Sequence, residues 1–227
     1  MTRLILASAS PRRRQILENL GVEVIVIPPA DEEETESFSS SQEYAEKLAR
    51  HKAWQIASSD HKGTCIVAAD TIVVIDEQIL GKPLDAQNAF AMLRLLAGRS
   101  HKVITGVCVI GPGGQVELLD SETTTVHFCD LSDEEIDCYI ASGEPFDKAG
   151  GYGIQGLGAL LVERIDGCYY NVVGLPVVKL QSMLNEFGIN ILLGCNNGSK
   201  VSLNDQGTPR RNEASREADC AGRGISQ

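Results

Sequence analysis

One carboxylate interrupts a long apolar run of the chain. Asp70 lies within Cys65-Ile-Val-Ala-Ala-Asp-Thr-Ile-Val-Val-Ile75, a pattern typical of a strand that is buried on both faces. A buried carboxylate must be ion-paired, bound to a metal or protonated, because burying it bare costs several kcal/mol. Asp70 is therefore a candidate general base or metal ligand. The alternative is an Asp that caps a neighbouring turn or breaks the strand.

Two lysines are candidates for contacting an anion. Lys52 follows Leu48 by four residues in a predicted helix over 41–57, so it projects toward the apolar side, near the edge of the stripe. A lysine at such a position can also extend its amine to water. Lys82 lies between Gly81 and Pro83 in a predicted loop, where on its own it would be a surface lysine.

The segment Ser8-Ala-Ser-Pro-Arg-Arg-Arg14 combines the features of a phosphate site. A short strand is predicted before it, and Pro11 suits the first position of a helix that Ser10 can cap. Backbone N–H groups, hydroxyls and guanidiniums together favour an anion. Arginines in a first turn oppose the helix dipole, a choice that an anion between them would explain. The alternative is a solvated basic turn.

Strands and helices alternate over the first 193 residues, which predicts one α/β domain. Helices are expected over 41–57 and 86–97, and another after the capping box of Ser132 and Glu135. Residues 159–165 and 168–173 are expected to form a hairpin around Asp166-Gly167. Residues 194–227 lack apolar periodicity and are rich in Gly, Asn, Ser and charge, which predicts a disordered tail without a part in the chemistry.

Composition excludes several classes of protein. The chain has 227 residues and a net charge of -11, which argues against nucleic-acid binding and against anionic membrane surfaces. We find no apolar run long enough to cross a bilayer. Its seven cysteines contain no CxxC pair and are typical of thiols in a reducing cytoplasm. A homodimer is the expected assembly from the frequency of such oligomers.

Taken together, the motifs resemble those of the Maf family of nucleoside triphosphate pyrophosphatases. The matching segments occur in the family's order and span roughly residues 4 to 190. They are Leu6-Ala-Ser-Ala-Ser-Pro-Arg-Arg13, Glu32-Glu33, Lys52, Ala69-Asp-Thr71, Gly81-Lys-Pro83, Ser100-His-Lys-Val-Ile-Thr105, Asp147-Lys-Ala-Gly-Gly-Tyr-Gly-Ile-Gln-Gly156 and Val173-Gly-Leu-Pro176.

The resemblance implies a twisted mixed sheet flanked by helices, in an elongated two-lobed fold with a central cleft, similar to the inosine triphosphate pyrophosphatases. It implies hydrolysis of a nucleoside triphosphate to the monophosphate and pyrophosphate with Mg²⁺ or Mn²⁺. Asp70 falls on the catalytic position, and Glu33 on the acidic position near the metal. The phosphate-contacting positions of the family correspond to Ser8, Arg13, Lys52 and Lys82.

Three further positions indicate the substrate branch. The dTTP/UTP branch carries Arg after Ser-Pro, Thr after the catalytic Asp and Gln in the Gly-Ile-Gln-Gly loop, and this chain has Arg12, Thr71 and Gln155 there. A Gln amide offers both a donor and an acceptor to the edge of uracil or thymine. The branch acting on 7-methyl-GTP differs at all three positions.

Two alternatives stay open at this point. One is a 7-methyl-GTP pyrophosphatase. The other is a nucleotide-binding regulator of cell division with little turnover, although the presence of Asp70, Lys52 and Lys82 together argues against it. A pyrophosphatase of this kind could also clear modified nucleotides.

Overall fold

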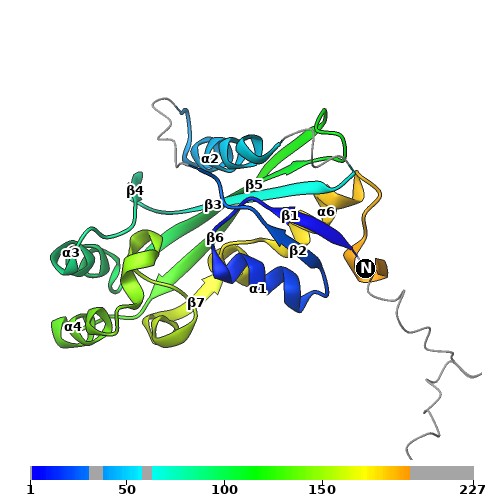
Figure 1. Ribbon diagram of the computed structural model, residues 1–227. Helices are drawn as coiled ribbons and strands as arrows, with labels where there is room; N and C mark the ends of the chain where they lie inside the picture. The colour runs from blue at the N-terminus through cyan, green and yellow to red at the C-terminus, as the bar shows by residue number, and fades with distance from the viewer. Residues whose placement is uncertain (1, 31–37, 58–62, 195–227) are drawn as a thin grey trace, which may run out of the picture. The chain divides into compact units, whose positions relative to one another are not determined.

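The computed structural model describes residues 2–30, 38–57 and 63–194 (Figure 1). Over these ranges the chain forms a seven-stranded sheet of order β2-β1-β3-β5-β6-β7, with β4 paired to β3. Strand β1 pairs in parallel with β2 and β3, and the other pairs are antiparallel. The strands are β1 (Arg3–Leu6), β2 (Glu23–Val26), β3 (Cys65–Ile75), β4 (Gln78–Leu80), β5 (Ser100–Ile110), β6 (Glu117–Phe128) and β7 (Val162–Asp166).

Helices flank this mixed sheet, which confirms the predicted α/β fold class. The α-helices are α1 (Pro11–Asn19), α2 (Ser41–Ile56), α3 (Ala86–Leu96), α4 (Asp133–Ala141), α5 (Tyr169–Val173), α6 (Val177–Asn185) and α7 (Ile191–Gly194). Three short 3₁₀ helices, η2 (Glu144–Asp147), η3 (Ala149–Gly151) and η4 (Gly156–Leu161), form the glycine-rich segment. The capping box of Ser132 and Glu135 is present at the start of α4, as predicted. Gly194, the first residue of the tail predicted over 194–227, is the last residue of α7, and the rest of that segment lies outside the described residues.

The two faces of β3 pack against different helices. Ala68 belongs to a buried cluster with Ala49 and Ala53 of α2, whereas Val67 packs with Leu17 of α1 and with α6. Figure 1 shows α2 on one side of the sheet and α1 on the other. Because successive side chains of a strand point to opposite faces, Asp70 and its neighbour Thr71 project to opposite sides of the sheet.

A glycine sets how closely α2 approaches the sheet. Gly106 of β5 lies directly opposite Asp70 in the strand register. A Cβ atom at Gly106 would come 2.2 Å from the carbonyl oxygen of Ala45 in α2, so only glycine leaves room for the helix backbone there. This close approach brings the buried face of α2, which carries Lys52, over β3.

The predicted hairpin over 159–173 is wrong. Residues Val162–Asp166 do form a strand, but β7 pairs with β6, and Tyr169–Val173 form helix α5. The β-favouring residues of this segment are overridden by tertiary bonds: the Asn171 amide donates to the Val103 carbonyl and to the Thr124 hydroxyl, both at 2.9 Å. Gly174, with φ of 120°, then ends the short helix.

Candidate active site

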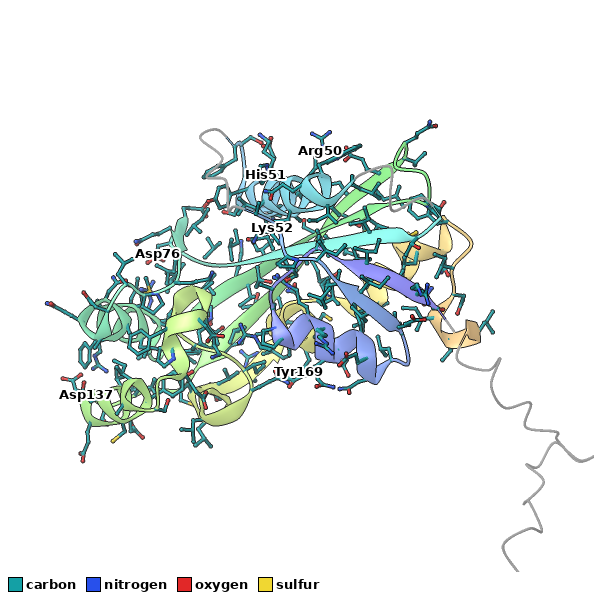
Figure 2. All side chains as sticks on the ribbon, viewed as in Figure 1. Arg50, His51, Lys52, Asp76, Asp137 and Tyr169 are labelled. Carbon is teal, nitrogen blue, oxygen red and sulfur yellow. The ribbon has the colours of Figure 1, made fainter. Side chains whose placement is uncertain are left out.

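Asp70 and Lys52 form a buried ion pair. Lys52 Nζ donates to Asp70 Oδ1 at 2.5 Å, and the two side chains are only 10% and 14% exposed. Figure 2 shows Lys52 on the side of α2 nearer the sheet, while Arg50 lies on the outer side. The lysine therefore does not extend to water, and its charge compensates the carboxylate that interrupts β3. Among the described residues, Asp70 Oδ2 accepts no hydrogen bond.

On the opposite face of β3, three acceptors among the described residues hold the Arg13 guanidinium. Nε donates to the Gly174 carbonyl at 2.8 Å, Nη1 to Ser8 Oγ at 3.2 Å, and Nη2 to Thr71 Oγ1 at 3.0 Å. Ser8 Oγ also accepts the Ser10 N–H at 3.1 Å. Because Ser8 accepts from two donors, its own hydroxyl hydrogen can point toward a third group, such as a phosphate oxygen.

Both groups flank a segment of β3 that is open on one side. Strand β1 pairs with β3 only up to Val67, and β4 pairs with it only from Val73. Within the described part of the chain, residues 68–72 have a strand partner on the β5 side alone. Asp70 and Thr71 lie at this interruption and are both partly exposed, whereas Ala68 and Ala69 are buried. A ligand bound at this point of the strand can contact both side chains.

Arg12 makes an ion pair with Asp147, the last residue of η2 in the glycine-rich segment. Its Nη1 contacts Asp147 Oδ2 at 2.8 Å, and Lys148 Nζ contacts the other carboxylate oxygen at 2.7 Å. Partial burial raises the pKa of Asp147, but hydrogen bonds from Lys148 and Arg12 outweigh this and leave it below its usual value. The pair ties the first turn of α1 to η2. Gln155, at the start of η4, is exposed.

The other predicted site residues are placed less fully. Lys82 is exposed, and the carbonyl of the preceding Gly81 accepts the Gly150 N–H at 2.9 Å, which joins this loop to η3. Glu33 lies outside the described residues. Over residues 2–30, 38–57 and 63–194 there is no group of three or more His, Cys, Asp and Glu side chains that could hold a metal.

The sequence did not single out two polar residues that are linked to Arg13 by hydrogen bonds through Thr71, namely Thr105 and Asn171. Both are fully buried. Thr105 interrupts an apolar strand in the same way as Asp70 does, so the same test would have found it. Asn171 could not be found in this way, because it was assigned to a strand that does not form.

A buried histidine lies apart from these groups. His101 Nε2 shares a hydrogen bond of 2.5 Å with the Tyr152 hydroxyl, and both rings pack against Phe128. Burial, with a smaller contribution from His127, lowers the pKa of His101 to about 4, so the ring is neutral near pH 7. It serves the core between β5 and the glycine-rich segment.

No helix in the described part of the chain is long and apolar enough to span a membrane. The five cysteines within that part, Cys65, Cys108, Cys129, Cys138 and Cys168, are free thiols.

The chain is similar to several proteins named dTTP/UTP pyrophosphatase. A dTTP/UTP pyrophosphatase from Caldicellulosiruptor bescii is 46% identical over 198 residues, which cover 86% of this chain and 99% of that protein. One of the same name from Syntrophomonas wolfei is 49% identical over 187 residues, or 82% of this chain and 98% of that protein.

A solved structure supports the fold. The Ham1 protein of Staphylococcus aureus superposes with a TM-score of 0.51 at 17% identity, over 82% of this chain and 99% of that chain. The family model described as "Maf-like protein" matches residues 3–187, which is nearly all of the described chain. The chain therefore belongs to the Maf family.

Proposed function

We propose that this protein hydrolyses dTTP and UTP to the nucleoside monophosphate and pyrophosphate. The observation that carries the proposal is the arrangement around residues 68–72 of β3, which among the described residues have a strand partner on the β5 side alone. A buried Asp70–Lys52 pair lies on one face, and the Ser8–Arg13 pair lies on the other. A carboxylate with one oxygen that accepts no hydrogen bond from the described residues, beside phosphate-binding cations, suits water attack on a phosphoanhydride. The relatives named dTTP/UTP pyrophosphatase support the substrate class.

In the proposed reaction, water attacks the α-phosphorus and a new P–O bond forms. The bond from the α-phosphorus to the bridging oxygen breaks, and pyrophosphate leaves. Asp70 either accepts the proton of the attacking water or orients that water. Lys52 holds Asp70 Oδ1, which directs Oδ2 toward the reaction. Arg13, the Ser8 hydroxyl and Lys82 bind phosphate oxygens, and this local cationic cluster offsets the net charge of -11.

We further propose that Mg²⁺ or Mn²⁺ takes part. Magnesium in such sites binds one or two carboxylates and completes its shell with water and substrate phosphates, and the partly exposed carboxylate of Asp70 fits this role. Asp70 and Glu33 would hold the ion. When bound, it would neutralise phosphate charge and polarise the attacking water.

The base is proposed to contact Gln155, whose exposed amide can pair with the edge of uracil or thymine. Arg12, which lies next to Arg13 on α1 and pairs with Asp147, is proposed as a second specificity residue. The resemblance also marks Thr71 as a specificity position, and its hydroxyl accepts a hydrogen bond from Arg13 Nη2 at 3.0 Å. We also propose that the protein works in the cytoplasm, where its free thiols stay reduced.

The test is pyrophosphate release by the purified protein with Mg²⁺ or Mn²⁺ from dTTP, UTP, CTP, 7-methyl-GTP, dITP and ATP. We expect dTTP and UTP to be turned over well above the purine nucleotides. Asp70→Asn is expected to lower kcat by about a hundredfold or more, because it removes the charge and the proton acceptor. Asp120→Asn is the matched control, since Asp120 pairs with Lys179 at 2.8 Å on the surface.

The other outcomes separate the alternatives. A preference for 7-methyl-GTP would keep the mechanism and discard the specificity argument. No turnover of any triphosphate, with nucleotide binding intact, would favour the regulatory function. Undiminished turnover in Asp70→Asn at saturating metal would refute the assigned chemistry.

A further inference from the structure

A chain of hydrogen bonds runs from the Arg13 guanidinium into the core. Arg13 Nη2 donates to Thr71 Oγ1 at 3.0 Å, and Thr71 Oγ1 lies 2.9 Å from Thr105 Oγ1. Thr105 Oγ1 in turn donates to the Asn171 carbonyl at 3.0 Å. Thr105 and Asn171 are fully buried, so water cannot substitute for these bonds without opening the core.

The proton count fixes the direction of this chain. A hydroxyl has a single hydrogen, and Thr105 gives its hydrogen to the Asn171 carbonyl, which can only accept. Thr71 must therefore donate to Thr105, and its remaining capacity is to accept from Arg13. In each of the three bonds the donor is therefore the group nearer to Arg13. The hydroxyl hydrogen of Thr71 is donated to Thr105 and is not available to a substrate.

A second path leads from Arg13 to the same carbonyl. Arg13 Nε donates to the Gly174 carbonyl at 2.8 Å, and the Gly174 N–H donates to the Asn171 carbonyl at 3.0 Å. A Cβ at Gly174 would lie 3.4 Å from Thr71 Oγ1 and 3.6 Å from Arg13 Nε, so this residue packs tightly against both partners. Both hydrogen-bond paths therefore end at the carbonyl oxygen of Asn171.

Asn171 is itself anchored to the sheet. Its amide donates to the Val103 carbonyl of β5 and to the Thr124 hydroxyl of β6, each at 2.9 Å. The carbonyl that both paths reach is therefore fixed relative to two central strands. A guanidinium held along two edges keeps one orientation and loses little further entropy when an anion binds.

We propose that Thr105 and Asn171 are positioning residues for Arg13, and that Thr71 acts through Arg13 instead of donating a hydrogen bond to the substrate base. This inference rests on the proposed binding of phosphate by Arg13. It assigns Thr71 to the recognition of the phosphate chain and leaves discrimination among bases to Gln155 and its surroundings.

The test compares Thr105→Val with Thr105→Ser. Valine keeps the shape of threonine but removes the hydroxyl, whereas serine keeps the hydroxyl. We expect Thr105→Val to raise the KM for dTTP and the dissociation constant for pyrophosphate, measured by calorimetry, about tenfold, the scale of one charge-assisted hydrogen bond. Thr105→Ser is expected to stay within about threefold of wild type, because the hydrogen-bond chain is preserved.

A double-mutant cycle distinguishes positioning from general damage to the core. Thr71→Val interrupts the same chain, so Thr105→Val should cost little more in the Thr71→Val background. In addition, Thr71→Val should lower kcat/KM for dTTP and CTP by the same factor. Additive losses, or a changed dTTP-to-CTP ratio in Thr71→Val, would overturn the inference.

Two controls keep the result interpretable. Should Thr105→Val fail to fold, Thr71→Val at its half-buried position must by itself weaken pyrophosphate binding with an unchanged dTTP-to-CTP ratio. If wild type neither hydrolyses a triphosphate nor binds pyrophosphate, the proposed function fails. If wild type is active and Thr105→Val matches it, only the positioning proposal fails.

Discussion

At the residue scale, the site is built from charged side chains whose orientation is fixed by protein acceptors. Lys52 is directed by Asp70, and Arg13 by Ser8, Thr71 and Gly174. Donors that are already oriented do not have to be reorganised when charge develops on a phosphate oxygen, which is how such sites lower a barrier. Because Lys52 and Asp70 are both buried, each charge needs the other to compensate the cost of its burial.

The buried pair gives a prediction on stability. Lys52→Met should destabilise the protein by about 3 kcal/mol or more, because Asp70 is left as an uncompensated buried charge. Adding Asp70→Asn to Lys52→Met should recover part of this loss. The measurement is urea unfolding of the single and double variants. Lys179→Met, which breaks the exposed pair with Asp120, should change stability by less than about 1 kcal/mol.

The absence of recovery in the Lys52→Met/Asp70→Asn protein would mean that the lost packing of Lys52, and not the uncompensated charge, caused the destabilisation.

His101 gives a prediction on pH. Its pKa falls from 6.5 to about 4 on folding, so the unfolded chain binds the proton more readily. The contribution of neutral His101 to the free energy of unfolding is therefore fully present above pH 6.5 and is lost as the pH falls toward 4. A pKa shift of this size corresponds to roughly 3 kcal/mol. His101→Gln should unfold with a shallower pH dependence than wild type between these values. Parallel curves for the two proteins, measured by denaturant unfolding, would contradict this.

At the element scale, the approach of α2 to β5 decides whether Lys52 reaches Asp70. Gly106→Ala places a Cβ 2.2 Å from the Ala45 carbonyl oxygen, a backbone atom that moves only if the helix moves. We expect this variant to lose both stability and turnover. Gly111→Ala is the control, because its Cβ would meet the Phe187 ring at 2.3 Å, away from α2.

Gly111→Ala should lower the melting temperature and keep kcat at temperatures where it is folded. If Gly106→Ala retained wild-type kcat, the close packing of α2 would not be what places Lys52.

The elements themselves were largely predictable where local signals agree. Strand β3 begins and ends at the predicted residues, Cys65 and Ile75, because a continuous apolar run bounded by turn residues leaves little choice. The start of α4 follows from its capping box. Helix α5 was not predictable, because the Asn171 bonds to Val103 and Thr124 join residues more than forty positions apart and override β propensity.

At the scale of the whole molecule, the sequence indicated candidate residues for the chemistry but not how these residues are divided between the two faces of the sheet. Asp70 and Thr71 are adjacent in the chain and face opposite sides of the sheet. The open segment of β3 between β1 and β4 follows from strand pairing over long separations. The local sequence pattern carries no information on such pairing. The placement of Asp70 and Thr71 on opposite faces of an unpaired segment is therefore seen only in the structure.

The same long-range packing extends the folded domain at least to α7. Ile191 of α7 is buried in the cluster that contains Leu4, Leu17 and Leu184, so the chain is needed at least to this helix. The match to the family model ends at residue 187.

We therefore expect a chain that ends at Gly194 to keep the kcat, the KM for dTTP and the melting temperature of the full chain. A chain that ends at Asn185 should be strongly destabilised, because it loses Ile191 together with Phe187 and Ile189, which pack against the same cluster. Thermal unfolding and steady-state kinetics of the three proteins decide the matter. A loss of turnover in the chain ending at Gly194, with an unchanged melting temperature, would assign residues 195–227 a part in the reaction.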